Sequence, residues 1–209
     1  MSSASCLRRC FGHSLGVMVA LIVAVAVIVE PTAQAAERSA RGVDEVGQGY
    51  TDYMPMKVFE PYAGKIWEGT GKDPAGEGVT DIARWEFIVG GRILQVTHSI
   101  GEGAYGGRTI YFYDEAEKKY LFHYFTTAGF HTLGEINVLK NGIESVEDVR
   151  GHETITKVKG LLQLTDEGFQ SSSTYLSNGE WIDGHIFTYS ETSTLPSFEN
   201  TPTTYDTAE

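Results

Sequence analysis

Three histidines stand at positions from which their side chains could do chemistry. His98, His123 and His185 each alternate with apolar residues in strand-like sequence, so each is predicted to point toward an apolar face. Imidazoles that converge on a dry pocket can bind a metal or transfer a proton, because their charge changes near neutral pH. The alternative is that each is a neutral, hydrogen-bonded histidine of the core. His152 falls in a predicted turn and is expected to be solvated.

Other catalytic and metal-binding patterns are missing from the sequence. It contains no His-x-His or His-Glu-x-x-His spacing for zinc and no Gly-x-Ser-x-Gly around a nucleophilic serine. The glycine-rich loop 101–107 lacks the Lys-Ser/Thr ending and the following helix of a phosphate-binding loop. Its Tyr105 could instead lie over a pocket as a lid. The sequence therefore predicts no metal site and leaves the catalytic residues unknown.

The elements that would position these side chains are short strands. From residue 66 to residue 189, about ten stretches alternate with period two and end at Gly, Asn or Asp. Gly90-Gly91, Asn141-Gly142 and Asn178-Gly179 predict tight hairpins. Such short links join antiparallel strands, because parallel pairs need crossovers of about a dozen residues or more. The expected strands are 66–72, 80–89, 92–100, 108–113, 120–126, 130–139, 143–149, 154–164, 169–176 and 181–189.

The predicted fold is all-β: a ten-stranded antiparallel up-and-down barrel with a short N-terminal helical turn. A closed barrel leaves no exposed sheet edge, which a meander of this length would otherwise present. The helical turn is expected within 52–62, limited by Pro55 and Pro61, and would cover one end of the barrel. The alternative is a sandwich of two sheets. A barrel, unlike a sandwich, encloses a pocket.

The first 35 residues have the pattern of a secretory signal peptide. Arg8 and Arg9 precede an apolar run, and Ala33-Gln34-Ala35 supplies a cleavage site. The run of about 15 residues is shorter than the roughly 20 that a spanning helix needs, so export to the periplasm or the outside is favoured over a membrane anchor. The two arginines also resemble a twin-arginine signal. The expected organisation is signal peptide 1–35, flexible segment 36–49, barrel domain 50–190 and disordered acidic Ser/Thr tail 191–209.

Cysteine usage and charge narrow the range of partners. Cys6 and Cys10 both lie in the predicted leader, so disulfides, thiolate catalysis and cysteine-bound zinc are not expected after cleavage. The chain carries 16 Lys and Arg against 28 Asp and Glu, a net charge of −12. Such an acidic surface repels nucleic acid and anionic membranes. We expect no nucleic acid partner and no stable membrane insertion after cleavage.

Aromatic side chains exceed what a small barrel needs to fill its interior. In the stretch 120–126 both strand faces are aromatic. If Leu121, His123 and Phe125 point inward, Tyr120, Phe122 and Tyr124 would point outward and form the contacts of a homodimer. The candidate ligand-binding residues are Trp67, Trp85, Phe87, His98, Tyr105, His123, Phe125, Tyr175, His185 and Phe187.

Three segments resemble a known group of proteins. The stretch 59–69, with its Gly-x-x-Trp-x-Gly pattern, is similar to the opening of calycin-type barrels, and 85–91 and 124–130 are similar to uncharacterised bacterial secreted proteins of that superfamily. Lipocalins, fatty-acid-binding proteins and the haem-binding nitrobindins are more distant relatives. The resemblance implies a barrel that holds a small apolar ligand. By analogy with these relatives, His185 would be the axial ligand of a haem, and Arg84 or Arg92 would bind a carboxylate.

The sequence thus favours an exported barrel that binds a small hydrophobic or amphipathic molecule. One alternative is an enzyme that uses the pocket histidines on a small apolar substrate, which requires two of His98, His123 and His185 within hydrogen-bond reach of one another or of a carboxylate across the cavity. Another alternative is binding of haem or a metal. No cofactor is predicted, and haem stays an alternative only.

Overall fold

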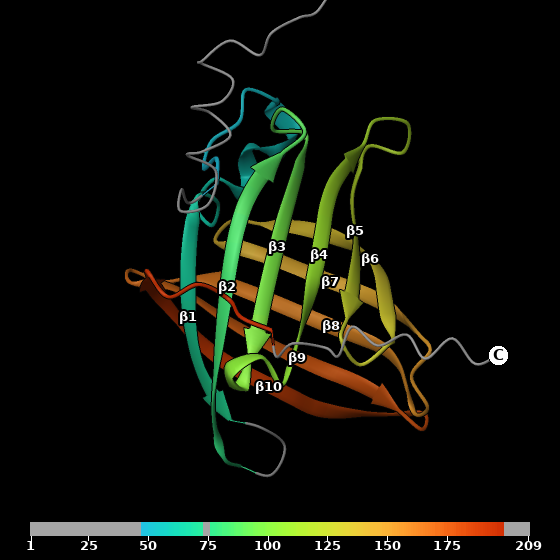
Figure 1. The fold of residues 1–209 in the computed structure, drawn as a ribbon. Coiled ribbons are helices and arrows are strands. Elements are labelled where there is room, and N and C mark those ends of the chain that lie inside the picture. The colour runs from blue at the N-terminus through green and yellow to red at the C-terminus, as the bar shows by residue number, and fades with distance from the viewer. Residues whose placement is uncertain (1–46, 73–75, 199–209) are drawn as a thin grey trace, which may run out of the picture. The chain divides into compact units, whose positions relative to one another are not determined.

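The computed structural model describes residues 47–72 and 76–198, and these form a closed barrel of ten antiparallel strands (Figure 1). Each strand pairs with the next in the chain, and the last pairs with the first. The predicted all-β, up-and-down barrel is therefore confirmed, and the sandwich alternative is wrong. The strands are β1 (Lys65–Lys72), β2 (Gly78–Ile88), β3 (Ile93–Ile100), β4 (Tyr105–Asp114), β5 (Lys119–Thr126), β6 (His131–Leu139), β7 (Gly142–Arg150), β8 (Ile155–Leu164), β9 (Gly168–Ser177) and β10 (Glu180–Thr192).

Short turns join most of the strands, as the glycine and asparagine pairs predicted. Asn178 and Gly179 link β9 to β10 with φ angles of 50° and 87°, the left-handed values that a two-residue hairpin requires. The connection at Gly90-Gly91 differs from the prediction. Ile88 pairs with Ile93, so four residues form the loop, and β2 ends before Val89.

A 3-10 helix, η1 (Met54–Phe59), covers one end of the barrel. Pro55 stands in its first turn, where a missing N–H costs no hydrogen bond. The helix is shorter than the predicted 52–62 and inserts Met56 and Phe59, both fully buried, into the barrel. A second 3-10 turn, η2 (Gly101–Gly103), links β3 to β4. The predicted loop 101–107 is therefore half strand, because β4 begins at Tyr105.

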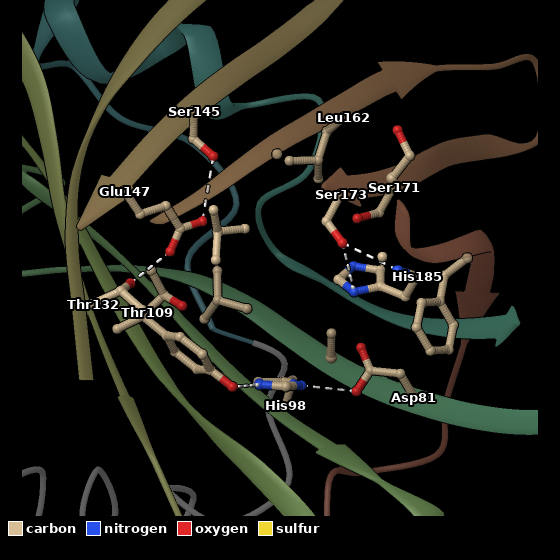
Figure 2. Close-up of a pocket in the computed structure, with 18 of the residues that line it drawn as sticks. Asp81, His98, Thr109, Thr132, Ser145, Glu147, Leu162, Ser171, Ser173 and His185 are labelled. Atoms are coloured by element: carbon tan, nitrogen blue, oxygen red, sulfur yellow. Dashed lines mark hydrogen bonds and ion pairs between the residues drawn. The ribbon is translucent and has the colours of Figure 1, made fainter. Parts of the chain in front are cut away.

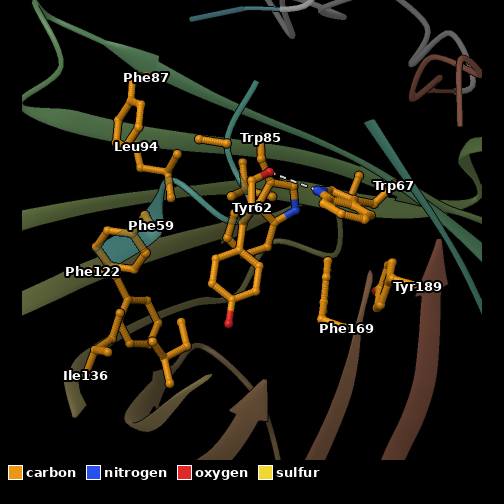
Figure 3. Close-up of a cluster of buried hydrophobic side chains, with 14 of the residues drawn as sticks. Phe59, Tyr62, Trp67, Trp85, Phe87, Leu94, Phe122, Ile136, Phe169 and Tyr189 are labelled. Atoms are coloured by element: carbon orange, nitrogen blue, oxygen red, sulfur yellow. Dashed lines mark hydrogen bonds between the residues drawn. The ribbon is translucent and has the colours of Figure 1, made fainter. Parts of the chain in front are cut away.

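Aromatic rings fill the half of the barrel next to η1 (Figure 3). Phe169 lies at the centre, with its ring centroid 4.4 Å from that of Tyr189, 5.2 Å from Trp67 and 5.3 Å from Tyr62. Trp85 stacks on Tyr62 at 5.3 Å. Such ring pairs add about 0.5–1.5 kcal/mol each beyond the burial of their area. This packed layer forms a solid floor across the barrel.

The faces of β5 are the reverse of those predicted. Phe122 is buried inside the barrel and Tyr124 also points inward, whereas His123 and Phe125 lie on the outer face, with Phe125 52% exposed. Phe122 pairs with Tyr111 of β4, whose side chain points into the barrel. This pairing determines which face of β5 points inward. The placement of His123 and Phe125 in the pocket is therefore wrong.

The predicted dimer contacts are also wrong in their orientation. Tyr120, Phe122 and Tyr124 all pack in the barrel interior, where a second copy of the chain cannot touch them. A homodimer stays a prediction without these residues.

The chain continues past β10 along the outside of the barrel. β10 ends at Thr192, two residues beyond the predicted domain boundary, and the Ser197 N–H donates to Oγ of Ser99 across 3.1 Å. At the other end of the described chain, Gln48 forms a β-bridge with Phe87, so the barrel's contacts begin before residue 50. No helix between residues 47 and 198 that the structure describes is long and apolar enough to cross a membrane. The predicted signal peptide lies outside the described residues.

Candidate functional site

The barrel contains a cavity of about 510 Å³ between the aromatic floor and the end opposite η1 (Figure 2). This volume is in the range that small-molecule sites occupy. Trp85 and Phe169 belong both to the floor and to the cavity lining. Exposed residues such as Lys72, His152 and Asp183 also line it, so the cavity opens to solvent at its far end.

Asp81 and His98 form the central polar contact of the cavity. His98 pairs with Ala83 in the β2–β3 ladder, so Asp81, two residues from Ala83, is its diagonal neighbour on the same inner face. Nδ1 of His98 lies 2.9 Å from Oδ1 of Asp81 (Figure 2). Both side chains are largely buried, at 5% exposure for Asp81 and 16% for His98. This carboxylate therefore orients the imidazole.

Two tyrosines extend this contact into a chain of hydrogen bonds. The Tyr124 hydroxyl lies 2.8 Å from Nε2 of His98, and the Tyr105 hydroxyl lies 2.9 Å from that of Tyr124. Burial raises the pKa of both phenols, so both keep their protons. Room for the Tyr124 ring comes from Gly107, where a Cβ atom would lie 2.5 Å from Cε2 of Tyr124.

Tyr189 holds the other oxygen of Asp81. Its hydroxyl donates to Oδ2 of Asp81 across 2.6 Å. Burial and the nearby Asp81 carboxylate raise the pKa of Tyr189, so the phenol stays protonated and acts as the donor. Asp81 thus has both oxygens engaged by side chains of the cavity.

A second histidine, His185 of β10, also lines the cavity. Nδ1 of His185 lies 2.8 Å from the Tyr175 hydroxyl and 3.1 Å from Oγ of Ser173. His185 lies on the same face of β10 as Phe187 and Tyr189, which also line the cavity, and the β9–β10 register shifts between Asp183 and Ile186. Burial lowers the pKa of His185, which keeps the imidazole neutral.

Glu147 of β7 is a buried carboxyl group in the same cavity. Thr132 donates to its Oε2 across 2.6 Å, and Oγ of Ser145 lies 3.5 Å from its Oε1 (Figure 2). Burial raises the pKa of Glu147, and these two hydroxyl contacts lower it by less. Glu147 therefore takes up a proton more readily than an exposed glutamate.

The charges around the cavity are mostly acidic. Lys72 is the only Lys or Arg in the described lining, against Asp81, Glu147 and Asp183. Arg84 points outward, as its strand pattern predicts, and contacts Glu86 at 2.9 Å. The guanidinium of Arg92 lies over the Tyr53 ring, 4.3 Å from its centroid, outside the cavity lining. Neither arginine can bind a ligand carboxylate in the cavity.

The predicted site residues divide into three groups. Trp67 and Phe87 are buried in the packed core and do not reach the cavity, and His123 and Phe125 lie on the outer surface. The alternation of apolar residues showed that these four residues lie on strands. It did not show which side chains pack together and which border an open cavity. The cavity is lined by the remaining six: Trp85, His98, Tyr105, Tyr175, His185 and Phe187.

Four residues of the site were missed at the sequence level: Asp81, Tyr124, Glu147 and Tyr189. Asp81 and Glu147 carried a usable signal, because each is an acidic residue on the inward phase of a strand, two positions from Ala83 and Ser145 respectively. Tyr124 was assigned to the wrong face of β5. Tyr189 ends the predicted strand 181–189 but was not among the candidate ligand-binding residues.

The cofactor alternatives stay untested. No group of three or more metal-binding side chains is found within the residues that the structure describes. His185 is available in the lining for a haem, with Nδ1 engaged by Tyr175 and Ser173, but anionic propionates would meet the acidic lining. Haem binding stays an alternative that an absorption spectrum with added haem tests directly.

The site consists of a buried polar chain beside an apolar space, which suits hydrogen bonding to a ligand and proton transfer. Comparisons of the sequence with known protein families and with curated proteins find no match. Function must therefore be inferred from the cavity itself.

Proposed function

We propose that this protein is an exported barrel that binds a small amphipathic molecule whose polar group is neutral or cationic. The observation that carries the proposal is one cavity with an apolar floor and buried hydrogen-bonding groups on its walls. Such a combination is typical of small-ligand sites, where apolar surface supplies affinity and a few polar groups fix orientation. Export and membership of the calycin-type barrels are part of the proposal, supported by the leader pattern and by the meander that follows a short helix.

The charge of the lining supports the choice of polar group. A ligand carboxylate in this cavity would lie near Asp81 and Glu147, with only Lys72 at the rim to compensate. Burying an unpaired charge beside like charges is costly. An alcohol, an amide or an amine avoids that cost. The ligand class therefore differs from the fatty acids that interior arginines would bind.

The test compares three molecules that have the same alkyl chain length but different polar groups: dodecanol, dodecylamine and dodecanoate. We expect the alcohol and the amine to bind and dodecanoate to bind at least about tenfold more weakly, a difference of roughly 1.4 kcal/mol. Titration calorimetry and native mass spectrometry would measure it. Dodecanoate as the tightest ligand would contradict the charge argument, and no binding by any of the three would contradict the proposal.

A cavity-filling variant locates the binding. Ser171 lies on the inner face of β9 and lines the cavity, so Ser171→Trp should abolish binding. Phe125→Ala removes an aromatic ring from the outer surface and should leave binding unchanged. Thermal unfolding of both variants checks that the barrel is intact.

A catalytic role is the second candidate, favoured by the 2.9 Å contact between His98 and Asp81. An imidazole held by a carboxylate can act as a general base through its other nitrogen. The raised pKa of Tyr124, caused by burial, makes that phenol a hydrogen-bond donor rather than a nucleophile. The test is turnover of naphthyl esters and enolisable ketones by wild type, His98→Gln and His123→Gln. Equal rates in all three would contradict catalysis.

A further inference from the structure

A chain of hydrogen bonds runs from Asp81 through His98 and Tyr124 to Tyr105. The number of protons on these groups determines which group donates in each bond. An ionised carboxylate only accepts, so Nδ1 of His98 donates its proton to Asp81. A neutral imidazole then has a bare Nε2, and Tyr124 must donate to it. The Tyr124 oxygen is left to accept from Tyr105. Tyr105, at the end of the chain, can then offer only its oxygen lone pairs to the cavity.

Protonation of His98 reverses every bond beyond it. An imidazolium donates from both nitrogens, so Nε2 donates to the Tyr124 oxygen. The Tyr124 hydroxyl proton must rotate toward the Tyr105 oxygen, and the Tyr105 proton becomes free to point into the cavity. One proton from solvent binds Nε2, and each phenol keeps its own proton. Only two hydroxyl rotations are needed.

We propose that Asp81, His98, Tyr124 and Tyr105 form a reversible relay that sets the polarity of the ligand site. With neutral His98 the Tyr105 hydroxyl accepts a hydrogen bond from the ligand, and with imidazolium it donates one. The inference rests on the proposed binding function and deepens it: ligands that offer an N–H donor bind in one state, and carbonyl ligands, which only accept, bind in the other.

Other titrating groups face the same space and must be separated from the relay. Burial raises the pKa of Tyr105 and Tyr124, so they respond by rotation and not by ionisation. Burial lowers the pKa of His185, against a smaller opposing effect of the Asp81 carboxylate, so His185 takes up a proton less readily than an exposed imidazole. The titratable groups that line the cavity with His98 are Lys72 from β1, Asp81 from β2, Tyr105 and Tyr111 from β4, Tyr124 from β5, Glu147 from β7, His152 from the β7–β8 turn, Tyr175 from β9, and Asp183, His185 and Tyr189 from β10.

Glu147 is the group most able to imitate the relay, because burial raises its pKa. Its ionisation changes the field of the cavity, but it does not interchange donor and acceptor at Tyr105. A relay predicts opposite pH trends for a donor ligand and an acceptor ligand. The same opposite trends should persist in Glu147→Gln.

The first arm of the test needs no ligand. ¹⁵N NMR of the labelled protein follows the ring nitrogens of His98, assigned by their loss in His98→Gln, with His123→Gln as the matched control. We expect a neutral form with the proton on Nδ1 and a form protonated on both nitrogens at lower pH. A neutral form with its proton on Nε2 would overturn the relay.

The second arm uses two neutral fluorescent probes: phenylnaphthylamine, which donates from N–H, and the naphthalene ketone Prodan, which accepts. On acidification from about pH 8 to about pH 5, we expect the amine to lose and the ketone to gain affinity. Each change should be about fivefold to tenfold, the worth of one net hydrogen bond. Tyr105→Phe should bind both probes without either trend.

The outcomes separate the relay from the binding function. Trends in the same direction for both probes, or trends that persist in Tyr105→Phe, would overturn the relay and leave the binding function standing. Failure of both probes and of the alkyl ligands to bind at any pH would overturn the binding function, and the relay with it.

Discussion

Two carboxyl groups on the inner barrel wall occupy different environments. Asp81 accepts from an imidazole and a phenol, so its negative charge is shared with strong donors. Glu147 is held by hydroxyl groups of Thr132 and Ser145, which are weaker partners for a charge. This difference makes the charge state of Glu147 important for stability.

Glu147→Gln should stabilise the barrel near neutral pH by on the order of 1 kcal/mol. The folded-state pKa of Glu147 is raised by burial, so the folded protein holds this proton longer than the unfolded chain does. Its contribution is therefore fully present below the ordinary glutamate pKa and is lost as pH rises through the raised value. Glutamine has no proton to lose, so this part of the pH dependence should disappear.

Urea unfolding of wild type and Glu147→Gln at a series of pH values measures the effect. Glu167→Gln in the exposed β8–β9 turn is the matched control and should unfold like wild type. A variant that is less stable than wild type at neutral pH would contradict the assigned burial cost.

At the residue scale, the sequence predicted part of the polar chain. The alternation of β3 correctly turned His98 inward, and the glycine-rich loop drew attention to Tyr105. Asp81 was not recognised, because its bond to His98 depends on the diagonal register of two strands. Hydrogen-bond partners across strands require the register, which one sequence gives only where a turn fixes it.

At the element scale, β5 shows why period two alone can fail. Both faces of Tyr120–Thr126 are aromatic, so alternation predicts a strand here but not which of its two faces points inward. The decision comes from the neighbouring strands: Gly107 of β4 leaves space for the ring of Tyr124, and Gly134 of β6, which pairs with Phe122, leaves space for the ring of Phe122. Small residues opposite large ones determine the face, and this pairing is visible only once strands are aligned.

Gly107→Ala should displace the Tyr124 ring and break its bond to His98. The added Cβ would meet both this ring and the backbone oxygen of Phe125, so the cost should be about 1–3 kcal/mol, as for other overpacked sites. Gly78→Ala in β2, where a Cβ meets nothing within 4 Å, is the matched control and should cost far less.

Thermal or urea unfolding of both glycine variants measures the difference, and the ¹⁵N signals of His98 report the lost hydrogen bond. Equal stability of Gly107→Ala and Gly78→Ala would show that the Tyr124 ring has room to move, and would contradict its close packing against Gly107.

At the scale of the whole molecule, closure depends on the aromatic floor. Phe169 contacts aromatic rings from the segment just after η1, from β1, from β2 and from β10. It therefore links the first strands of the barrel to the last one. The sequence predicted the barrel because short hairpins exclude parallel pairing. It did not predict where the floor ends and the cavity begins, which depends on how η1 inserts into the barrel.

Phe169→Ala should destabilise the barrel by about 3–5 kcal/mol, the usual cost of removing a large buried ring. Phe125→Ala, with the same change of side chain at a 52% exposed position, should cost less than about 0.5 kcal/mol. Denaturant midpoints of the two variants measure the contrast. A small effect at Phe169 would mean that the floor is not the stabilising layer.

The pairing of β1 with β10 has a consequence for how the chain is made. The hydrogen bond between Tyr189 and Asp81 joins residues 108 positions apart, across the seam where the first and last strands meet. On the ribosome, nine strands emerge before the tenth can complete this bond. Asp81 therefore acquires its final partner only when the last strand has emerged. In a circular permutant cut at residues 101–103, Tyr189 would be made before Asp81, so Asp81 would meet this partner as soon as its own strand emerged.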